Sequence, residues 1–486
     1  MHIGTVASPN WARRRWRGPS GRSSRLMSGN GVYRGPRLRD AALISPPDLS
    51  RTLFWEAEGS ISARQIVARA AALAERLPER GTAVVFHERR DYFVAALIAA
   101  WSRGATAVLP AGSGARDLEG IIGGADGAYC LSEQPLRQSP AIPVFIGAAL
   151  PAGDAAAWIP SLPMDATAIR IFTSGSTGVP TGNDKSWATL AAAAAPTARM
   201  IGLDRLCTPS IVATVPSNHM YGLELTVLQV LQAGASVHVE RPAYPADIAR
   251  CLVESPSPRV LVTTPFHLRG LMESDIVLPP VARVISATAP MSAEFALSAE
   301  RRICAPVHEI YGFTEIGSVA TREPARQSDW TMRDDLIAIS DGGVAVAAWR
   351  SFEDRKPFPD VVEVVDERRI RLLGRSRDIV KVAGKRASLP GLSAELTRIP
   401  GVEDGVLILM AEDEGRGLVS RLAAFVVAPA LSATQIRHEL RRFIDPAFMP
   451  RYVFHVSSLP RNETGKLRQG DLQKLAAEKL FRDELL

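Results

Sequence analysis

The segment FTSGSTGVPTG, residues 172–182, has the residue types best suited to hold a polyphosphate. It follows the apolar run AIRIF, which predicts a strand ending in a tight turn. Its glycines let the backbone approach a ligand closely, and its hydroxyls add donors to the backbone N–H groups. The Gly-Lys-Ser/Thr ending of the Walker loop is absent. Taken alone, the segment could equally be a flexible surface turn. The residues predicted to form this phosphate cradle are Thr173, Ser174, Gly175, Ser176, Thr177 and Gly178.

Three further segments follow the cradle in a fixed order. They read YGFTE at 311–315, GRSRDIVK at 374–381 and PRNETGK at 460–466. In this order the chain resembles the adenylate-forming enzymes, which include acyl- and aryl-CoA ligases, amino-acid adenylation domains and luciferase. The resemblance spans roughly residues 50 to 475. It implies a ligase that couples a carboxylic acid to AMP from ATP and then transfers the acyl group to a thiol.

Attack of a carboxylate on the α-phosphorus of ATP brings two anions together. Such a reaction needs a cation that spans both and a metal on the polyphosphate. The resemblance implies that Lys466 is this cation and that Glu315 binds Mg²⁺, because a hard cation prefers carboxylate oxygen. By the same resemblance Thr314 contacts the α-phosphate, and Lys381 serves the second half-reaction.

Three more residues are implied to bind the nucleotide. Tyr311 would pack its ring on adenine, and Arg375 would reach the ribose. Asp360, in PFPD, stands where the family usually has a Thr-Gly-Asp triplet, and would accept hydrogen bonds from the ribose hydroxyls. An ordinary turn acid is the alternative for Asp360.

The cradle departs from the family pattern at its end. The family has Pro-Lys-Gly there, whereas this chain has Thr181 between the proline and the glycine. Lys185, four residues further on, is the candidate to supply the missing charge. A displaced lysine followed by Trp187 is similar to small bacterial ligases of aryl-polyene and xanthomonadin-type pathways.

The segment PSNHMYG, residues 216–222, matches the part of the family that closes over the acyl substrate. His219 is therefore the candidate gate, although it could merely cap a strand end. Tyr221, Ala287 and Thr288 are expected to line the substrate slot. Amino-acid-activating relatives have an aspartate just past this point. Here Glu224 is the one acid, and it does not occupy the position that matches that aspartate. Because an unpaired buried ammonium is costly, we expect an aryl or fatty acid as the substrate.

The acceptor thiol is left open between CoA and the phosphopantetheine arm of an acyl carrier protein, which would then be a partner. A luciferase-like adenylate-forming monooxygenase would share every motif. A binding module that has lost catalysis is the other alternative, and the missing cradle lysine is the one feature that favours it.

The segments that must position these residues alternate between helical and extended patterns. SARQIVARAAALAERL predicts a helix between 61 and 77, AVVFH a strand at 83–87, and YFVAALIAAWSRG a helix ending at 104. The alternation predicts an α/β fold in which stacked, mostly parallel sheets carry helices. Binding residues in such sheets gather at the carboxyl ends of strands.

From residue 374 the segments become shorter and more charged, which predicts a small α+β domain. The resemblance places the boundary at Arg377–Asp378 and implies a mobile lid. We therefore expect an AMP-binding domain at 41–376 and a C-terminal lid at 377–486.

Composition narrows the function classes. The net charge of +6 over 486 residues is concentrated in residues 1–40, which have nine arginines, no lysine and one acid, or +8. The remainder has 48 basic and 50 acidic residues, or −2, which gives no case for nucleic-acid binding. The sequence contains no run of eighteen apolar residues, so no membrane span is predicted. The four cysteines are far apart, so a disulfide or zinc framework is not expected and a reducing cytoplasm is. The oligomeric state is not predicted.

The arginine-rich head, residues 1–40, has no apolar core of the kind found in a secretory signal. We expect it to be disordered, and we hypothesise that translation starts at Met27. An amphipathic organelle-targeting peptide is the alternative, although the proline and glycine content disfavours a regular helix. The intact mass of protein made from the native gene tests this start.

Overall fold

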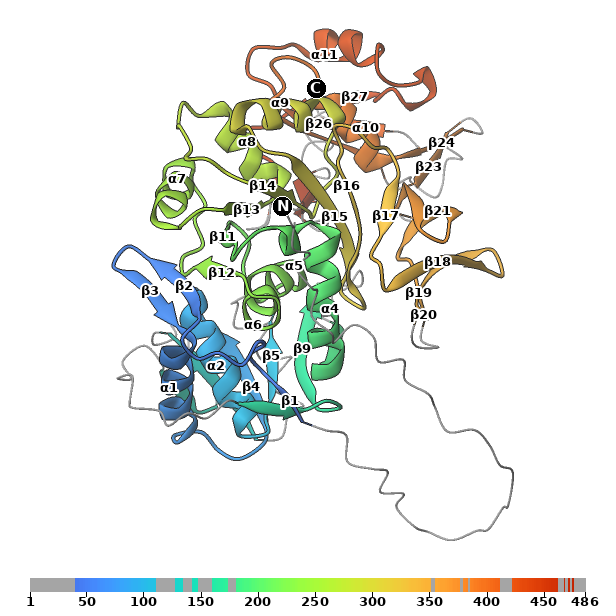
Figure 1. The fold of residues 1–486 in the computed structure, drawn as a ribbon. Helices are drawn as coiled ribbons and strands as arrows, with labels where there is room; N and C mark the ends of the chain where they lie inside the picture. The colour runs from blue at the N-terminus through green and yellow to red at the C-terminus, as the bar shows by residue number, and fades with distance from the viewer. Residues whose placement is uncertain are drawn as a thin grey trace, which may run out of the picture. The chain divides into compact units, whose positions relative to one another are not determined.

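The structure is a computed structural model. It describes residues 40–110, 127–133, 142–146, 160–173, 181–350, 355–375, 379–382, 385–410, 422–461, 467, 471–472 and 474–475. Two large sheets with helices confirm the α/β class (Figure 1). Within these ranges, no helix has both the length and the apolar character that a membrane crossing requires.

The first large sheet has six strands. Its neighbours pair in parallel except for β9 and β10, which form an antiparallel hairpin. In order across the sheet the strands are β10 (Thr181–Ser186), β9 (Thr167–Thr173), β5 (Thr106–Leu109), β4 (Thr82–Phe86), β6 (Ala128–Ser132) and β7 (Val144–Ile146).

The second large sheet has eleven strands. Its central strands, from β15 to β2, are parallel, and both flanks are antiparallel. In order across the sheet the strands are β21 (Asp360–Asp366), β22 (Arg369–Arg375), β17 (Trp330–Met332), β16 (Gly317–Arg322), β15 (Val307–Phe313), β14 (Arg283–Ser286), β13 (Arg259–Thr263), β11 (Ser210–Ala213), β12 (Ser236–His238), β2 (Thr52–Glu56) and β3 (Gly59–Ser62).

The helices begin and end where the local sequence dictates. At the start of α1, the Ser62 and Gln65 side chains cap each other's backbone N–H groups in a capping box. The apolar sequence of α2 suits its position, because nearly all of its residues are buried. The helices are α1 (Ala63–Ala74), α2 (Arg90–Ser102), α4 (Trp187–Met200), α5 (Met220–Leu223), α6 (Gln229–Gln232), α7 (Pro245–Glu254), α8 (Pro265–Glu273), α9 (Ala293–Ile303), α10 (Leu389–Leu396) and α11 (Ala433–Leu440).

The largest apolar core draws side chains from both sheets and from the helices α1, α2, α4 and α6. Within it the Trp101 ring of α2 lies 5.4 Å from the Trp187 ring of α4. The Trp101 indole N–H also donates to the carbonyl oxygen of Ala168 on β9. These contacts fix α4, and the strand that precedes it, relative to the six-stranded sheet.

The remaining strands form small sheets. Residues 379–455 contain the short antiparallel and mixed segments that the sequence predicts for an α+β region, with their own apolar core. The predicted boundary at Arg377–Asp378 lies outside the described residues. The strands are β1 (Asp40–Ala42), β8 (Ser161–Pro163), β18 (Leu336–Asp341), β19 (Val344–Trp349), β20 (Arg355–Pro357), β23 (Ile379–Val382), β24 (Lys385–Ser388), β25 (Asp404–Leu409), β26 (Leu422–Val427) and β27 (Tyr452–His455).

Candidate active site

The β9–β10 hairpin holds both ends of the phosphate cradle. Thr173 pairs with Thr181 in the ladder, so the cradle spans the end of the hairpin. Residues 174–180, which include the cradle residues from Ser174 to Gly178, lie outside what the structure describes, as do the side chains of Thr173 and Thr181. The ladder continues to Lys185, which pairs with Ile169. Because strand residues alternate between faces, positions 181 and 185 fall on one face of β10.

Lys185 is 4% exposed and is among the few buried charged residues of the described chain. Its ammonium donates a hydrogen bond to the carbonyl oxygen of Glu315. Burial lowers the pKa of Lys185 to about 8, although the carboxylates of Glu224 and Glu315 oppose that change. Lys185, on the first large sheet, thus lies against the turn between β15 and β16 of the second sheet.

Glu315 lies in the turn between β15 and β16. The strands cross closely there, because a Cβ at Gly312 would come 2.3 Å from the carbonyl oxygen of Gly317. Thr314 is half-buried in the same turn, whereas Glu315 is exposed. No hydrogen bond joins the Glu315 carboxylate to another described residue. An exposed carboxylate whose backbone is anchored fits a Mg²⁺ ligand that shares the ion with phosphate.

Tyr311 and Asp360 are 49 residues apart in sequence and meet in the structure. The Tyr311 hydroxyl donates to Asp360 Oδ2 at 2.8 Å. Asp360 also pairs with Arg375 in the β21–β22 ladder. Tyr311 on β15 thus meets Asp360 on β21 although three strands lie between them in the sheet order, and Arg375 is the ladder partner of Asp360. The side chain of Arg375 is not described.

The ring of Tyr311 belongs to an aromatic cluster. It stacks on Phe358 with ring centroids 6.2 Å apart and an interplanar angle of 23°, and meets Trp330 edge-on at 5.9 Å. It is 8% exposed. An adenine that packs on Tyr311 would therefore have to extend or displace this cluster.

The residues predicted to contact the acid follow β11 and β14. His219 is half-buried at the N-terminus of α5 and makes no side-chain cap there. The Tyr221 hydroxyl lies 3.1 Å from the carbonyl oxygen of Thr263 and 3.0 Å from that of Ile285, so it reaches the carboxyl ends of β13 and β14. Ala287 is buried beyond β14. Thr288 is exposed and has a φ of 81°, a costly conformation for a β-branched residue.

Two predicted lysines are not placed by the structure. Lys466 lies outside the described residues. Lys381 lies on β23, but its side chain is not described. Their roles in the two half-reactions stay predictions.

Sequence reasoning missed two buried charged residues near the site. Glu224 is 2% exposed and both of its oxygens accept hydrogen bonds from Ser318. Arg90, 1% exposed, donates to the carbonyl oxygens of Ala213 and Val215 at the end of β11, just before the gate segment. For Glu224 the available signal was an acid inside an apolar run, which is costly unless paired. Arg90 gave no such signal, because charged residues flank it on both sides.

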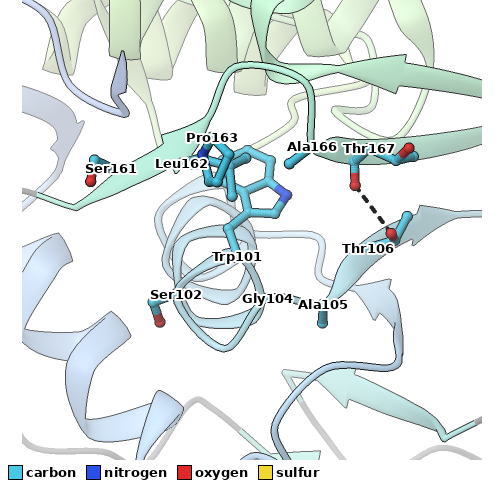
Figure 2. Close-up of a pocket in the computed structure, with 10 residues that line it drawn as sticks. All are labelled: Trp101, Ser102, Gly104, Ala105, Thr106, Ser161, Leu162, Pro163, Ala166 and Thr167. Carbon is cyan, nitrogen blue, oxygen red and sulfur yellow. Dashed lines mark hydrogen bonds between the residues drawn. The ribbon is translucent and has the colours of Figure 1, made fainter. Parts of the chain in front are cut away.

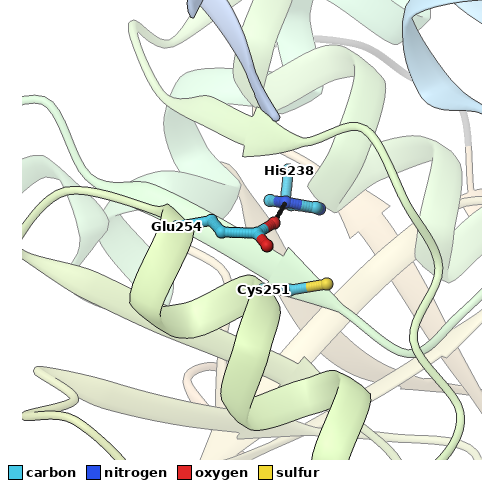
Figure 3. A group of neighbouring side chains, drawn as sticks. All are labelled: His238, Cys251 and Glu254. Carbon is cyan, nitrogen blue, oxygen red and sulfur yellow. Dashed lines mark hydrogen bonds and ion pairs between the residues drawn. The ribbon is translucent and has the colours of Figure 1, made fainter. Parts of the chain in front are cut away.

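His238, Cys251 and Glu254 form a cluster that their sequence spacing did not reveal (Figure 3). Their potential ligand atoms lie within 4.8 Å of one another. However, His238 Nδ1 accepts the N–H of Glu240, so Nε2 carries the proton that is donated to Glu254 at 2.9 Å. A metal on Nε2 would require that proton on Nδ1, against the N–H of Glu240. The hydrogen bonds therefore favour a structural role for this cluster.

A cavity of about 470 Å³ lies at the amino ends of β5 and β9 (Figure 2). Trp101, Leu162 and Pro163 line it, together with Thr106, whose hydroxyl donates to the carbonyl oxygen of Thr167. None of the predicted site residues lines this cavity. It lies at the opposite end of β9 from the cradle.

Comparisons with known proteins agree on one family. The family model described as AMP-binding enzyme matches residues 41–336. A 4-coumarate–CoA ligase from Rhodobacter capsulatus is 29% identical over 311 residues, which cover 63% of this chain and 76% of the relative. A 4-coumarate–CoA ligase from Halorhodospira halophila is 28% identical over 333 residues, covering 65% and 79%.

Solved structures support the same fold. ATP-bound MatB from Rhodopseudomonas palustris superposes with a TM-score of 0.74 at 18% identity, covering 90% of this chain and 99% of that structure. The o-succinylbenzoate–CoA synthetase of Bacillus subtilis, in complex with ATP and magnesium, has a TM-score of 0.73 at 16% identity, covering 87% and 97%. At these identities the likeness concerns the fold.

Proposed function

The chain belongs to the AMP-binding enzyme family, and on that premise we propose that it is an ATP-dependent ligase that converts an aryl carboxylic acid into a thioester through an acyl-adenylate. The observation that carries the proposal is the contact between the Lys185 ammonium and the carbonyl oxygen of Glu315. It puts a cation of β10, the strand that follows the phosphate cradle, beside the candidate metal ligand.

In the first half-reaction a carboxylate oxygen of the acid bonds to the α-phosphorus of ATP. The bond from that phosphorus to the bridging oxygen breaks, and pyrophosphate leaves. Lys466 would hold the two anions together, and Lys185 would add positive charge near the leaving group. Mg²⁺ held by Glu315 would neutralise charge on the polyphosphate. Tyr311, Asp360 and Arg375 would orient adenosine.

In the second half-reaction a thiolate sulfur attacks the acyl carbon, and AMP leaves with the oxygen that joined it to the acid. We propose Lys381 for this step. CoA is the proposed acceptor, because the relatives matched over most of their length are named as CoA ligases. The matches to multidomain synthases, such as an isonitrile lipopeptide synthase, cover about a quarter of this chain. Loading of a carrier protein remains an outcome of the test.

The substrate is proposed to be a carboxylic acid without an α-ammonium group. Glu224, the acid nearest the gate residues in sequence, is buried and bound to Ser318, so it does not offer a counter-ion. The named activity of the 4-coumarate–CoA ligases favours an aryl acid over a fatty acid. We propose a cytoplasmic location, which the wide spacing of the four cysteines in the sequence supports.

The test is pyrophosphate release from Mg²⁺-ATP with aryl, medium-chain, long-chain and amino acids, first without a thiol. We expect pyrophosphate release with aryl acids in the absence of a thiol, and AMP formation without oxygen consumption once a thiol acceptor is present. CoA and a phosphopantetheinylated carrier protein are then compared as acceptors. Lys466→Ala is expected to abolish release while the protein stays folded. Release that depends on amino acids alone would contradict the proposed substrate class, and near-normal release by Lys466→Ala would contradict its role.

A further inference from the structure

We propose that Glu224 is a positioning residue, which holds the turn that carries Glu315 and thereby sets where the candidate metal ligand lies. The inference rests on the proposed function. It concerns a residue that lies outside the cradle, YGFTE, GRSRDIVK and PRNETGK segments and is 94 positions from its hydrogen-bond partner.

The backbone around Glu224 departs from a regular helix. Glu224 begins one turn of π-helix, Glu224–Leu228, between α5 and α6. A π-turn inserts an extra residue into a helix, breaks its hydrogen-bond register and is frequent at functional sites. Here it brings a carboxylate into the described core, where isolated charges are expensive. A buried acid on such a turn implies that its contacts compensate for the cost.

The Glu224 carboxylate makes those contacts with Ser318, three residues after Glu315. The backbone N–H of Ser318 donates to both Glu224 oxygens, at 3.1 and 2.9 Å, and its hydroxyl donates to Oε2 at 2.6 Å. Gly317, with a φ of 101°, makes room for the carboxylate, because a Cβ there would come 2.3 Å from Glu224 Oε1. The turn is thus shaped to receive this side chain.

Two cations act on the same turn. Arg333, 1% exposed, donates to the carbonyl oxygen of Ser318 at 2.7 Å, and Lys185 donates to the carbonyl oxygen of Glu315. Burial raises the pKa of Glu224, and Arg333, Ser318 and Lys185 oppose that rise. Three buried charged side chains therefore fix the main chain at 315 and 318, while the Glu315 carboxylate itself stays exposed.

A purely structural role for Glu224 would predict loss of stability without a specific effect on metal-assisted binding. A positioning role predicts that removing the charge impairs the binding that depends on Glu315. Residues that orient a metal ligand typically change metal affinity or activity by about 10–100-fold when mutated. The structural role and the positioning role therefore predict different values for the gain in ATP affinity that Mg²⁺ produces.

The experiment measures ATP binding to the full-length protein by calorimetry, with Mg²⁺ and with EDTA. Glu224→Gln keeps the shape and an acceptor oxygen but removes the charge. The matched control is Gln229→Met in α6, which removes a buried polar side chain whose amide donates to the carbonyl oxygen of Ala194 and not to the chain at 315–318. We expect Glu224→Gln to lose at least about tenfold of the affinity that Mg²⁺ adds, with its affinity in EDTA unchanged. Gln229→Met should keep both affinities.

A double substitution tests whether Glu224 acts on Mg²⁺ binding through Glu315. In a Glu315→Gln background, Glu224→Gln should cause no further loss of the Mg²⁺ effect, because both changes act on one ligand. Should Glu224→Gln not fold, Ser318→Ala removes only the hydroxyl donor and is expected to lose part of the effect.

Three results would overturn the inference. One is a folded Glu224→Gln that keeps the full Mg²⁺ effect, and another is the same result for Ser318→Ala when Glu224→Gln does not fold. The third is an equal loss in Gln229→Met. Wild-type protein that gains no ATP affinity from Mg²⁺ and releases no pyrophosphate would instead overturn the proposed function, and the inference with it.

Discussion

At position 185 an ammonium group lies buried against the carbonyl oxygen of Glu315, where desolvation disfavours its charge. A lysine that served only the fold would be a poor choice there, because an apolar side chain of similar length avoids that cost. Function is the better explanation of why a charge is kept. The sequence alone suggested Lys185 as the replacement for the missing cradle lysine. Its contact with Glu315, 130 residues away, could not be read from spacing.

Lys185→Met should therefore separate activity from stability. A pKa lowered from 10.5 to about 8 corresponds to a cost of about 3 kcal/mol for the charged form in the fold. We expect the free energy of unfolding to stay equal or rise, while pyrophosphate release falls by about 100-fold. Urea denaturation and the release assay measure the two effects. Adding Thr181→Lys to this variant should restore part of the activity, because positions 181 and 185 share a face of β10. A Lys185→Met protein that loses stability but keeps its activity would contradict the proposed role.

Among the elements, the segment after β11 departs from the single regular helix that its sequence favours. Residues 222–233 read GLELTVLQVLQA, which is mostly apolar. The structure has α5, one π-turn and α6 instead. Apolar residues continue through the π-turn, so periodicity gave no sign of the break. Only Glu224, an acid within an apolar run, marked it. The antiparallel flank formed by β16, β17, β21 and β22 was also not predicted, because it depends on pairing between distant segments.

The same segment gives a prediction from two helical glycines. A Cβ at Gly222 would come 1.9 Å from the carbonyl oxygen of Pro216, so Gly222→Ala must displace the gate segment. We expect a loss of about 2 kcal/mol in the free energy of unfolding, together with weaker binding of the acid. Gly270, in α8, meets nothing within 4 Å, so Gly270→Ala should stabilise by about 0.5–1 kcal/mol. Denaturant unfolding of both variants checks this, and equal effects would show that the close approach at Gly222 is not tight.

For the whole molecule, the alternation of helical and extended patterns was enough to predict the α/β class, and the order of the motifs was enough to predict the family. Motif order could not say which distant residues meet, because each motif describes only its own backbone. The hydrogen bond from Tyr311 to Asp360 depends on how distant strands are ordered in the second sheet, and that from Ser318 to Glu224 depends on how the π-turn packs against β16. The cluster of His238, Cys251 and Glu254 was missed for the same reason.

Acid should destabilise the molecule through histidines that are buried in their neutral form. Burial lowers the pKa of His87, His267 and His308 from 6.5 to about 4. Between these values the unfolded chain binds more protons than the folded one, so stability falls as the pH drops from about 6.5 to 4. The loss amounts to up to about 3 kcal/mol per histidine. Urea unfolding at pH 7, 6 and 5 measures the loss. The variant His267→Gln should show a smaller change of the free energy of unfolding with pH. A free energy of unfolding that stays constant over this range would contradict the prediction.

The shared face of positions 181 and 185 bears on how such a chain can arise. The lysine can change position during evolution through an ancestor that has lysine at both 181 and 185. Every intermediate sequence then keeps a positive charge on that face of the strand. Each step is then a single substitution that selection can tolerate. A database search that demands lysine at the first position would discard such descendants as inactive, whereas one that accepts either position would retain them.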